Sequence, residues 1–162
     1  MSKVIIPKDL PTVKVFAIKE GTVVDHIKAG NALKIIRILN LADNQKVVTV
    51  GLNLSSKTLG LKDIIKVEKR ELTADEISRV AILAPQATIN IVRNYKIDKK
   101  FQAEMPKVIE YVVVCPNPKC LTNNESVPTK FNVAFKADGI RLKCHYCEKI
   151  FREHEIVSYK NN

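Results

Sequence analysis

The chain contains 162 residues, of which 27 are Lys or Arg and 17 are Asp or Glu, and its formal net charge is +10 at pH 7. No apolar run approaches the ~18 residues that a membrane-spanning helix needs, so the sequence predicts no such helix. Residues 1–9 lack the basic start, long apolar segment and cleavage site of an export signal, and we therefore expect a cytoplasmic protein.

The positive charge is concentrated in the first two thirds of the sequence. Residues 1–107 hold 19 Lys and Arg against 11 Asp and Glu, a net of +8, while residues 108–162 hold 8 against 6, a net of +2. Such an excess is typical of chains that bind nucleic acid, anionic lipid or phosphorylated small molecules. All four cysteines lie in the second part, which favours two domains, residues 1–107 and 108–162.

Hydrophobic periodicity predicts alternating strands and helices in the first part. Ala32, Ile35 and Leu39 share one helical face. Thr73 and Glu76 match a capping box at the start of a second helix, which Pro85 ends. The predicted elements are a strand at 12–18, a turn at 20–22, a helix at 32–41, a strand at 46–52, a loop at 53–60, a strand at 63–67, a helix at 73–84 and a strand at 88–92, which 95–97 extends or follows. This order predicts an α+β domain of the ferredoxin-like βαββαβ type, with two helices on one face of an antiparallel sheet.

The second part is predicted to be a small all-β domain. Residues 98–106 are polar and end in proline, which is typical of a connector. Strands are predicted at 108–115, 130–135 and 140–144. A domain of this size has a marginal core, so a bound metal ion is expected to supply much of its folding free energy.

The cysteines form the pattern C-x4-C followed later by C-x2-C. Two close pairs of thiolates on separate turns can surround Zn²⁺ in a closed tetrahedron. Cys115, Cys120, Cys144 and Cys147 therefore predict one structural zinc ion per chain, in a domain of the zinc-ribbon or rubredoxin-like type.

Other interpretations of the cysteines remain open at this point. An even number of cysteines also permits two disulfide bonds in an oxidising compartment, and the tetrapeptide at 144–147 alone resembles a redox pair. His145 and His154 are close enough in sequence to compete as ligands, although four thiolates already complete the set. A complete set leaves no open position for a catalytic water.

No catalytic motif is present in the sequence. G-x-S-x-G, H-E-x-x-H and the Walker loop G-x-x-x-x-G-K-[ST] are all absent. Asp25 and His26 could form an acid–base pair, but neighbouring side chains on a strand point to opposite faces. We therefore predict that the chain is not an enzyme.

Four motifs resemble the regulatory chain of aspartate carbamoyltransferase. They are Gly21–Ile27, Val50–Leu54, Ala84–Asn90, and Cys115–Cys120 together with Leu142–Lys149. The resemblance covers residues 13–157. It implies an N-terminal effector domain that binds ATP, CTP or UTP and a C-terminal zinc domain that docks on a separate catalytic chain. It also implies regulatory homodimers, three of which hold two catalytic trimers together, and a reaction of pyrimidine biosynthesis that takes place on the partner.

The same resemblance implies which residues form each site. Lys62, Lys66 and Lys100 match nucleotide contacts of the family. Asp25 matches a contact to the ribose, and His26 matches a position near the phosphates. Asn117 and Glu148 match polar contacts to the catalytic chain. The full set implied for the nucleotide is Val15, Ala17, Ile18, Val23, Asp25, His26, Lys62, Lys66, Asn90, Val92, Tyr95, Ile97 and Lys100. Phe16 replaces an acidic residue of well-known bacterial members, and residues 1–12 form an N-terminal extension.

A nucleic-acid-binding adaptor is the alternative from another functional class. A basic ferredoxin-like domain can serve as an RNA platform when aromatic side chains on its sheet stack on bases. The predicted strands offer only Phe16 and Tyr95 for this purpose. We therefore expect nucleotides, and neither nucleic acid nor membrane, as partners of the first domain.

Overall fold

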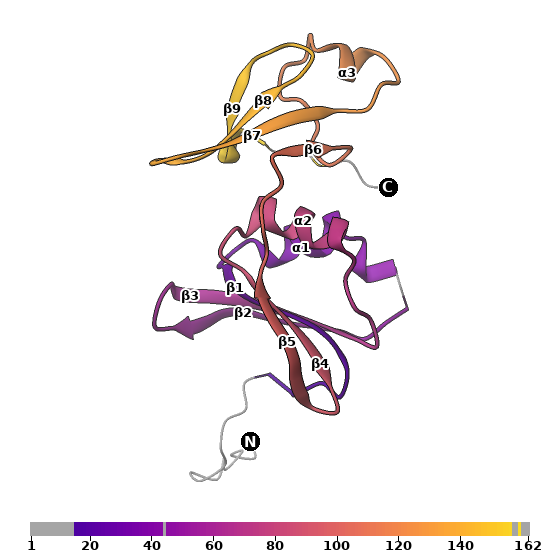
Figure 1. The fold of residues 1–162 in the computed structure, drawn as a ribbon, viewed down its shortest axis with the longest axis vertical. Helices are drawn as coiled ribbons and strands as arrows, with labels where there is room; N and C mark the ends of the chain where they lie inside the picture. Colours follow the sequence, from indigo (N-terminus) through magenta and orange to yellow (C-terminus); the bar gives the residue numbers. More distant parts are fainter. Residues whose placement is uncertain (1–14, 44, 157–158, 160–162) are drawn as a thin grey trace, which may run out of the picture.

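The computed structural model describes residues 15–43, 45–156 and 159, and the predicted N-terminal extension, residues 1–12, lies outside them. Two antiparallel sheets stand at opposite ends of this part of the molecule, and two helices lie between them (Figure 1). No helix in the described ranges is both long enough and apolar enough to cross a membrane.

The first sheet has five strands, and both helices cover the same face of it (Figure 1). Its elements in chain order are β1 (Gly21–Lys28), α1 (Ala32–Ile38), a 3₁₀ turn (Leu41–Asp43), β2 (Val48–Ser56), β3 (Gly60–Glu68), α2 (Ala74–Leu83), β4 (Thr88–Arg93) and β5 (Lys96–Gln102). The strands lie in the order β2-β3-β1-β4-β5, and each neighbouring pair is antiparallel. The first four strands and the two helices confirm the ferredoxin-like βαββαβ arrangement, to which β5 is added beside β4.

The second sheet has four antiparallel strands in the order β6-β7-β8-β9. Its elements are β6 (Val108–Glu110), α3 (Leu121–Asn124), β7 (Lys130–Lys136), β8 (Gly139–Cys144), β9 (Ile150–Arg152) and a 3₁₀ turn (Glu153–Glu155). The strand predicted at 108–115 is too long, because Tyr111, with φ of 62°, turns the backbone out of the ladder. Val113 keeps only an isolated bridge to Tyr159.

The strand predicted at 12–18 is wrong over the residues that can be judged. Residues 15–18 form no strand, and 12–14 lie outside the described ranges. The first strand is β1, which contains part of the predicted turn. Its pairing with β3 shifts between Val24 and Ile27, because a bulge inserts an extra residue there. Val24 and Ile27 both face the core although they are three positions apart in the sequence. The strand therefore lacks the alternation of apolar and polar residues that would predict it.

Two segments predicted as loop or connector also belong to strands. β2 continues to Ser56 through the first half of the predicted loop, and its pairing with β3 shifts between Gly51 and Leu54. β5 occupies most of the predicted connector, and all of its side chains are exposed. An edge strand of this kind has no buried face, so it shows no hydrophobic alternation.

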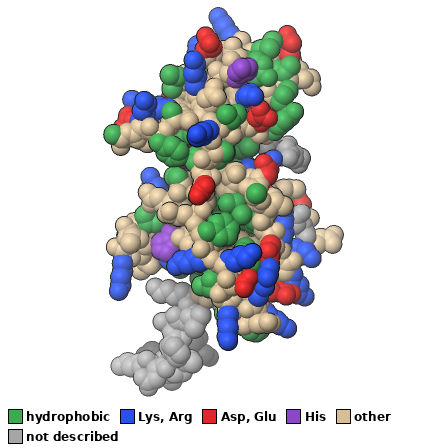
Figure 2. All heavy atoms as spheres, viewed as in Figure 1, with side chains coloured by type: hydrophobic (Ala, Val, Ile, Leu, Met, Phe, Trp, Pro, Cys, Tyr) green, Lys and Arg blue, Asp and Glu red, His purple; other side chains and the backbone are tan. Residues whose placement is uncertain are grey.

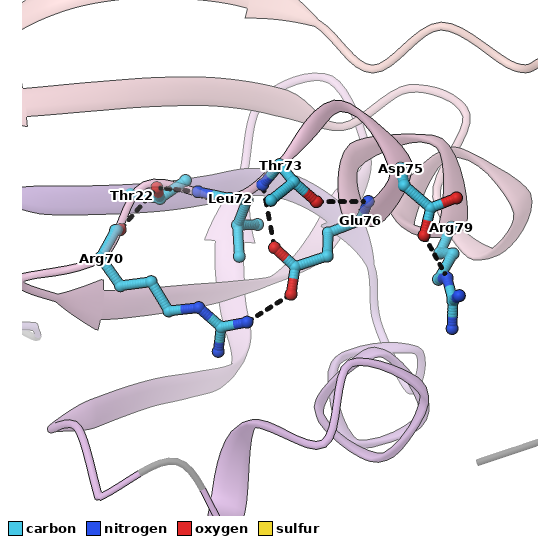
Figure 3. Close-up of polar contacts among 7 residues, drawn as sticks. All are labelled: Thr22, Arg70, Leu72, Thr73, Asp75, Glu76 and Arg79. Carbon is cyan, nitrogen blue, oxygen red and sulfur yellow. Dashed lines mark hydrogen bonds and ion pairs between the residues drawn. The ribbon is translucent and has the colours of Figure 1, made fainter. Parts of the chain in front are cut away.

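Helix α2 begins at the predicted capping box, which the structure confirms (Figure 3). The Thr73 hydroxyl accepts a hydrogen bond from the Glu76 amide at 3.3 Å, and the Glu76 carboxylate accepts one from the Thr73 amide at 2.9 Å. The same carboxylate pairs with Arg70. Thr22 of β1 donates to the Arg70 carbonyl at 2.9 Å and accepts from the Leu72 amide at 3.1 Å. Figure 3 shows how these contacts join the sheet to the helix.

Asp63 of β3 is a fully buried carboxylate that joins three segments. Its oxygens accept hydrogen bonds from the backbone amides of Gly30 at 2.9 Å, Ala32 at 3.3 Å and Asn53 at 3.0 Å. The first two amides lead into α1, and the third belongs to the bulge of β2. The charge is therefore compensated by backbone dipoles rather than by a cation.

One continuous cluster of buried apolar side chains runs from the first sheet through the helices to the second sheet. The last part of α2 shows this most clearly, because Val80, Ala81, Ile82 and Leu83 are all buried. Four successive residues cover the whole circumference of a helix. The helix is therefore enclosed by the first sheet on one side and by the second half of the chain on the other (Figure 1).

Candidate functional site

The four cysteines converge in the second half of the chain. Cys115 and Cys120 enclose the loop before α3, Cys144 ends β8, and Cys147 follows in the next turn. All four sulfur atoms lie within 4.8 Å of one another, and the Cys115–Cys147 and Cys120–Cys144 pairs are each 3.7 Å apart. A disulfide bond requires about 2.05 Å, so these free thiols are not paired as disulfides.

The geometry of this cluster fits a metal ion. Four sulfurs around a tetrahedral ion, at a metal–sulfur distance of about 2.3 Å, lie about 3.8 Å from one another. The two 3.7 Å pairs match that edge without rearrangement. Within the described ranges no histidine or carboxylate joins the cluster, and His145 instead contacts the Tyr146 ring edge-on. The donor set is closed and all-sulfur, which is typical of a structural site.

The surroundings make the thiolate form unfavourable for some of these cysteines unless a cation is bound. Burial raises the pKa of Cys115 and of Cys144. Burial also acts to raise the pKa of Cys147, but hydrogen bonds from the Lys149 backbone and the Asn117 side chain outweigh it, and this pKa is about 7. A bound divalent ion stabilises all four thiolates at neutral pH.

Helix α3 holds the first ligand loop in shape, and its residues are absent from the sequence-based prediction. The Thr122 hydroxyl donates to the Cys120 sulfur at 3.3 Å. The side-chain nitrogen of Asn123 donates hydrogen bonds of 2.8 Å to the backbone carbonyls of Cys115 and Asn117. The polar residues 122–124, which follow the second cysteine after one leucine, are the only sequence signal for this role.

Asn117 and Glu148, which the resemblance assigns to a docking surface, lie on the two ligand loops. The Asn117 carbonyl accepts from the Cys120 amide at 2.9 Å. The Glu148 side chain is exposed, and its backbone has φ of 58° and donates to the Cys144 carbonyl at 3.0 Å. Each loop therefore presents a polar residue whose backbone is fixed by a bond to a ligand residue.

A second group of predicted residues forms a row across the open face of the first sheet. Lys66 of β3 pairs with Val23 of β1, Val23 with Asn90 of β4, and Asn90 with Lys100 of β5. Residues paired in this way project from the same face. Their neighbours Val24, Ile65 and Ile89 are buried in the core on the other face. Thr49 of β2 extends the row beside Lys66, and only the strand register identifies it.

Asp25 and Lys62 lie on the same face, next to this row. The Lys62 ammonium is 2.7 Å from one Asp25 oxygen, and the His26 amide donates to the same carboxylate at 2.7 Å. Burial acts to raise the pKa of Asp25, but Lys62 and His26 together hold it below its usual value. His26 Nδ1 lies 3.5 Å from the other Asp25 oxygen without forming a hydrogen bond. The two side chains therefore do not point to opposite faces as predicted, but the carboxylate is bonded to Lys62 and to the His26 backbone rather than to the imidazole.

The remaining predicted residues lie where the segment before β1 meets the β4–β5 turn. Val92 and Ile18 are buried, whereas Tyr95 and Ile97 are 67% and 60% exposed. The Tyr95 amide donates to the Lys19 carbonyl at 2.9 Å, which joins the segment to the turn. These four residues give this end of the face an apolar character. Val15 and Ala17 lie on the same segment, half-buried and exposed respectively.

Several polar groups on the open face lack the partners that a ligand could supply. Asn90 is 7% exposed, and its side-chain oxygen has no hydrogen-bond partner among the described residues. His26 Nδ1 is likewise buried without one. Burial lowers the pKa of Lys66, against the effect of Asp25, and the hydrogen bonds of its ammonium to described residues go to the Val15 and Phe16 carbonyls. Buried donors and acceptors of this kind are expected to find partners when a site is filled.

Comparison with known proteins identifies the family of the chain. Residues 13–104 match the family model described as "Aspartate carbamoyltransferase regulatory chain, allosteric domain", and residues 107–157 match the metal binding domain of the same regulatory chain. The aspartate carbamoyltransferase regulatory chain of Pyrococcus horikoshii is 50% identical over 151 residues, which are 92% of this chain and 99% of the relative. That of Tolumonas auensis is 48% identical over 145 residues, 90% of this chain and 94% of the relative. With its thiolate cluster and its open sheet face, the chain belongs to the family of aspartate carbamoyltransferase regulatory chains.

Proposed function

We propose that this chain is the non-catalytic subunit that carries nucleotide control to the catalytic trimers of aspartate carbamoyltransferase in pyrimidine biosynthesis. ATP, CTP and UTP are the proposed effectors, and they bind on the open face of the first sheet. The observation that carries the proposal is the row from Lys66 to Lys100, which places one cation on each side of the buried Asn90, whose side-chain oxygen has no hydrogen-bond partner among the described residues.

The charges and contacts of this face suit a nucleoside triphosphate. Such a ligand carries about four negative charges, which two or three lysines on one face can attract without a glycine-rich loop. In the proposed pose Lys62, Lys66 and Lys100 contact the phosphates with His26 nearby, and Asp25 contacts the ribose. The base lies toward Ile18, Val92, Tyr95 and Ile97, framed by the backbone of Val15 and Ala17, with Val23 and Asn90 beneath the ligand.

Zinc is the proposed ion of the thiolate cluster, with one ion per chain and a structural role. A closed tetrahedron of four thiolates is the donor set that zinc favours, and soft sulfur ligands disfavour magnesium or calcium. Free thiols and a thiolate-bound ion persist in a reducing compartment, which supports the cytoplasmic location expected from the sequence.

The metal loops are proposed to dock on the catalytic chain. Asn117 and Glu148 would provide polar contacts, and the exposed Tyr146 and Ile150 supply apolar area beside them. The proposed assembly has regulatory homodimers, three of which hold two catalytic trimers. Nucleotide would bind two quaternary states with unequal affinity, and this difference, typically ~1–3 kcal/mol, limits what can reach the catalytic sites.

Calorimetric titration with ATP, CTP and UTP tests the nucleotide site. Lys100→Gln is expected to weaken binding about tenfold, because it removes a charged contact to phosphate. Lys99→Gln is the matched control, since Lys99 pairs with buried Ile91 and so projects from the helix-covered face of the same strand. Equal effects of the two variants, or tighter binding of random RNA than of any nucleotide, would contradict the proposal.

Mixing the chain with its catalytic partner tests the docking proposal. Cys144→Ser is expected to lose the metal ion, unfold the second half and abolish assembly, while nucleotide binding persists. Mass measurement and aspartate saturation curves with each nucleotide report assembly and control. A zinc-free variant that still assembles with the catalytic trimers would refute the role of the metal.

A further inference from the structure

A cleft of about 970 Å³ lies where the two halves of the chain meet, and its lining shares no residue with either site described above. Its floor is apolar and consists of Ile38, Leu83, Ile140 and Ile156. Its first wall contains Lys28, Gly30, Asn31, Lys34 and Arg37, and its second wall contains Asp138, Gly139, Arg141, Arg152, Glu153 and His154. The size is within the range of small-molecule sites, roughly 300–1,000 Å³.

The charged groups around this cleft are mostly cationic. Among the described residues that line it, five are Lys or Arg and two are Asp or Glu. One of the two carboxylates, Asp138, is already paired with Arg141. Lys28, Arg37 and Arg152 form no ion pair within the described ranges. The excess of three positive charges lies on the first wall, so an anion in the cleft is attracted mainly by that wall and, on the other side, by Arg152, which is unpaired among the described residues.

The charges of the second wall cancel, because it holds Arg141 and Arg152 beside Asp138 and Glu153. Partial desolvation acts to raise the pKa of Asp138, but Arg141 and then Arg152 outweigh it and hold this pKa below its usual value. Arg152 is therefore close enough to act on the Asp138–Arg141 pair. The guanidinium groups of Arg37 and Arg152 can each form two parallel hydrogen bonds to a phosphate, which a lysine cannot.

We propose that this cleft is a second anion site, which binds a small phosphorylated molecule between Arg37 of the first half and Arg152 of the second. The ligand contacts both walls and adds to the apolar contacts that already join the two halves. The site is independent of the nucleotide site proposed on the open sheet face, because no residue is common to both.

Titration of the ¹⁵N-labelled, metal-loaded full chain with inorganic pyrophosphate at constant ionic strength tests this inference by NMR. The amides of Gly30 and Gly139 report on the two walls, and the amide of Asn90 reports on the sheet face. Saturable shifts are expected at both glycines. Arg37→Gln and Arg152→Gln are each expected to weaken these shifts about tenfold.

Lys143→Gln is the matched control, because it removes the same charge from an exposed position of β8 that does not line the cleft. Lys100→Gln separates this site from the sheet face and is expected to leave the glycine shifts unchanged. Shifts at one wall only, or equal weakening by Lys143→Gln and Arg152→Gln, would overturn the bridging site. Citrate that binds as tightly as pyrophosphate would overturn the assignment to phosphate.

Discussion

The buried carboxylate of Asp63 provides the sharpest test of how the first half is held together. Asp63→Ala removes the acceptor of three backbone amides, those of Gly30, Ala32 and Asn53. A hydrogen bond to a charged group contributes about 1.5–3 kcal/mol, and an amide left without a partner costs a similar amount. Gly30 and Asn53 are exposed residues, so water can hydrate their amides once the carboxylate is removed, and we expect a loss of about 3–6 kcal/mol rather than the full sum.

Asp63→Asn refines this prediction, because it keeps one oxygen but turns an N–H group toward an amide that needs an acceptor. The expected loss is smaller, about 1–3 kcal/mol. Urea unfolding of the metal-loaded chain at fixed concentration, followed through amide signals of β1 and β3, measures both variants. Asp98→Asn is the control: this exposed carboxylate contacts only Arg93, at 3.2 Å, and its change should lie within experimental error. If Asp63→Ala cost no more than Asp98→Asn, the reasoning would be refuted.

Three further substitutions test other features of the first half. Glu76→Ala removes the capping box and the ion pair with Arg70, and chemical denaturation should show that the unfolding free energy falls by about 1–3 kcal/mol. The control Asp75→Ala breaks only the exposed contact to Arg79 and should lower it by about 0.5 kcal/mol or less. Burial lowers the pKa of Lys66, so the unfolded chain binds more protons at alkaline pH and the charge of Lys66 opposes folding. Lys66→Met should therefore leave the unfolding free energy unchanged or higher, while calorimetry shows about tenfold weaker ATP binding. A loss of stability that parallels the loss of binding would contradict this. Gly21 has φ of 133°, and an added Cβ would lie 2.0 Å from the Val67 carbonyl oxygen, whereas a Cβ at Gly60 would face open space. Thermal unfolding should therefore show that Gly21→Ala is more destabilising than Gly60→Ala by about 2 kcal/mol or more.

The metal cluster could be predicted from the sequence because its information is local. Each pair of cysteines is set by a short spacing, and the preference of thiolates for one ion requires the two pairs to meet. The open sheet face is different. Lys66 and Lys100 become members of one row only through the register of four strands, which no local pattern encodes.

Secondary structure was predictable where an element has a buried face and a regular pattern. Helix α2 has both a capping box and an apolar face, and its predicted and observed ends differ by one residue. β1 contains a bulge and β5 is fully exposed, so neither shows regular alternation, and of β5 only the start was predicted, as the strand at 95–97. Asp63 resembles an ordinary surface acid in the sequence, because its burial depends on amides that are distant along the chain.

The enclosure of the last turns of α2 has an evolutionary consequence. A helix at the surface can exchange the residues of its outer side freely as lineages diverge, but Val80, Ala81, Ile82 and Leu83 offer no such side. A change of volume here disturbs a neighbouring layer in either direction. Substitution in this segment should therefore be slow. A smaller side chain on the helix should be accompanied by a larger one at a contacting position of the sheet domain or of the metal domain.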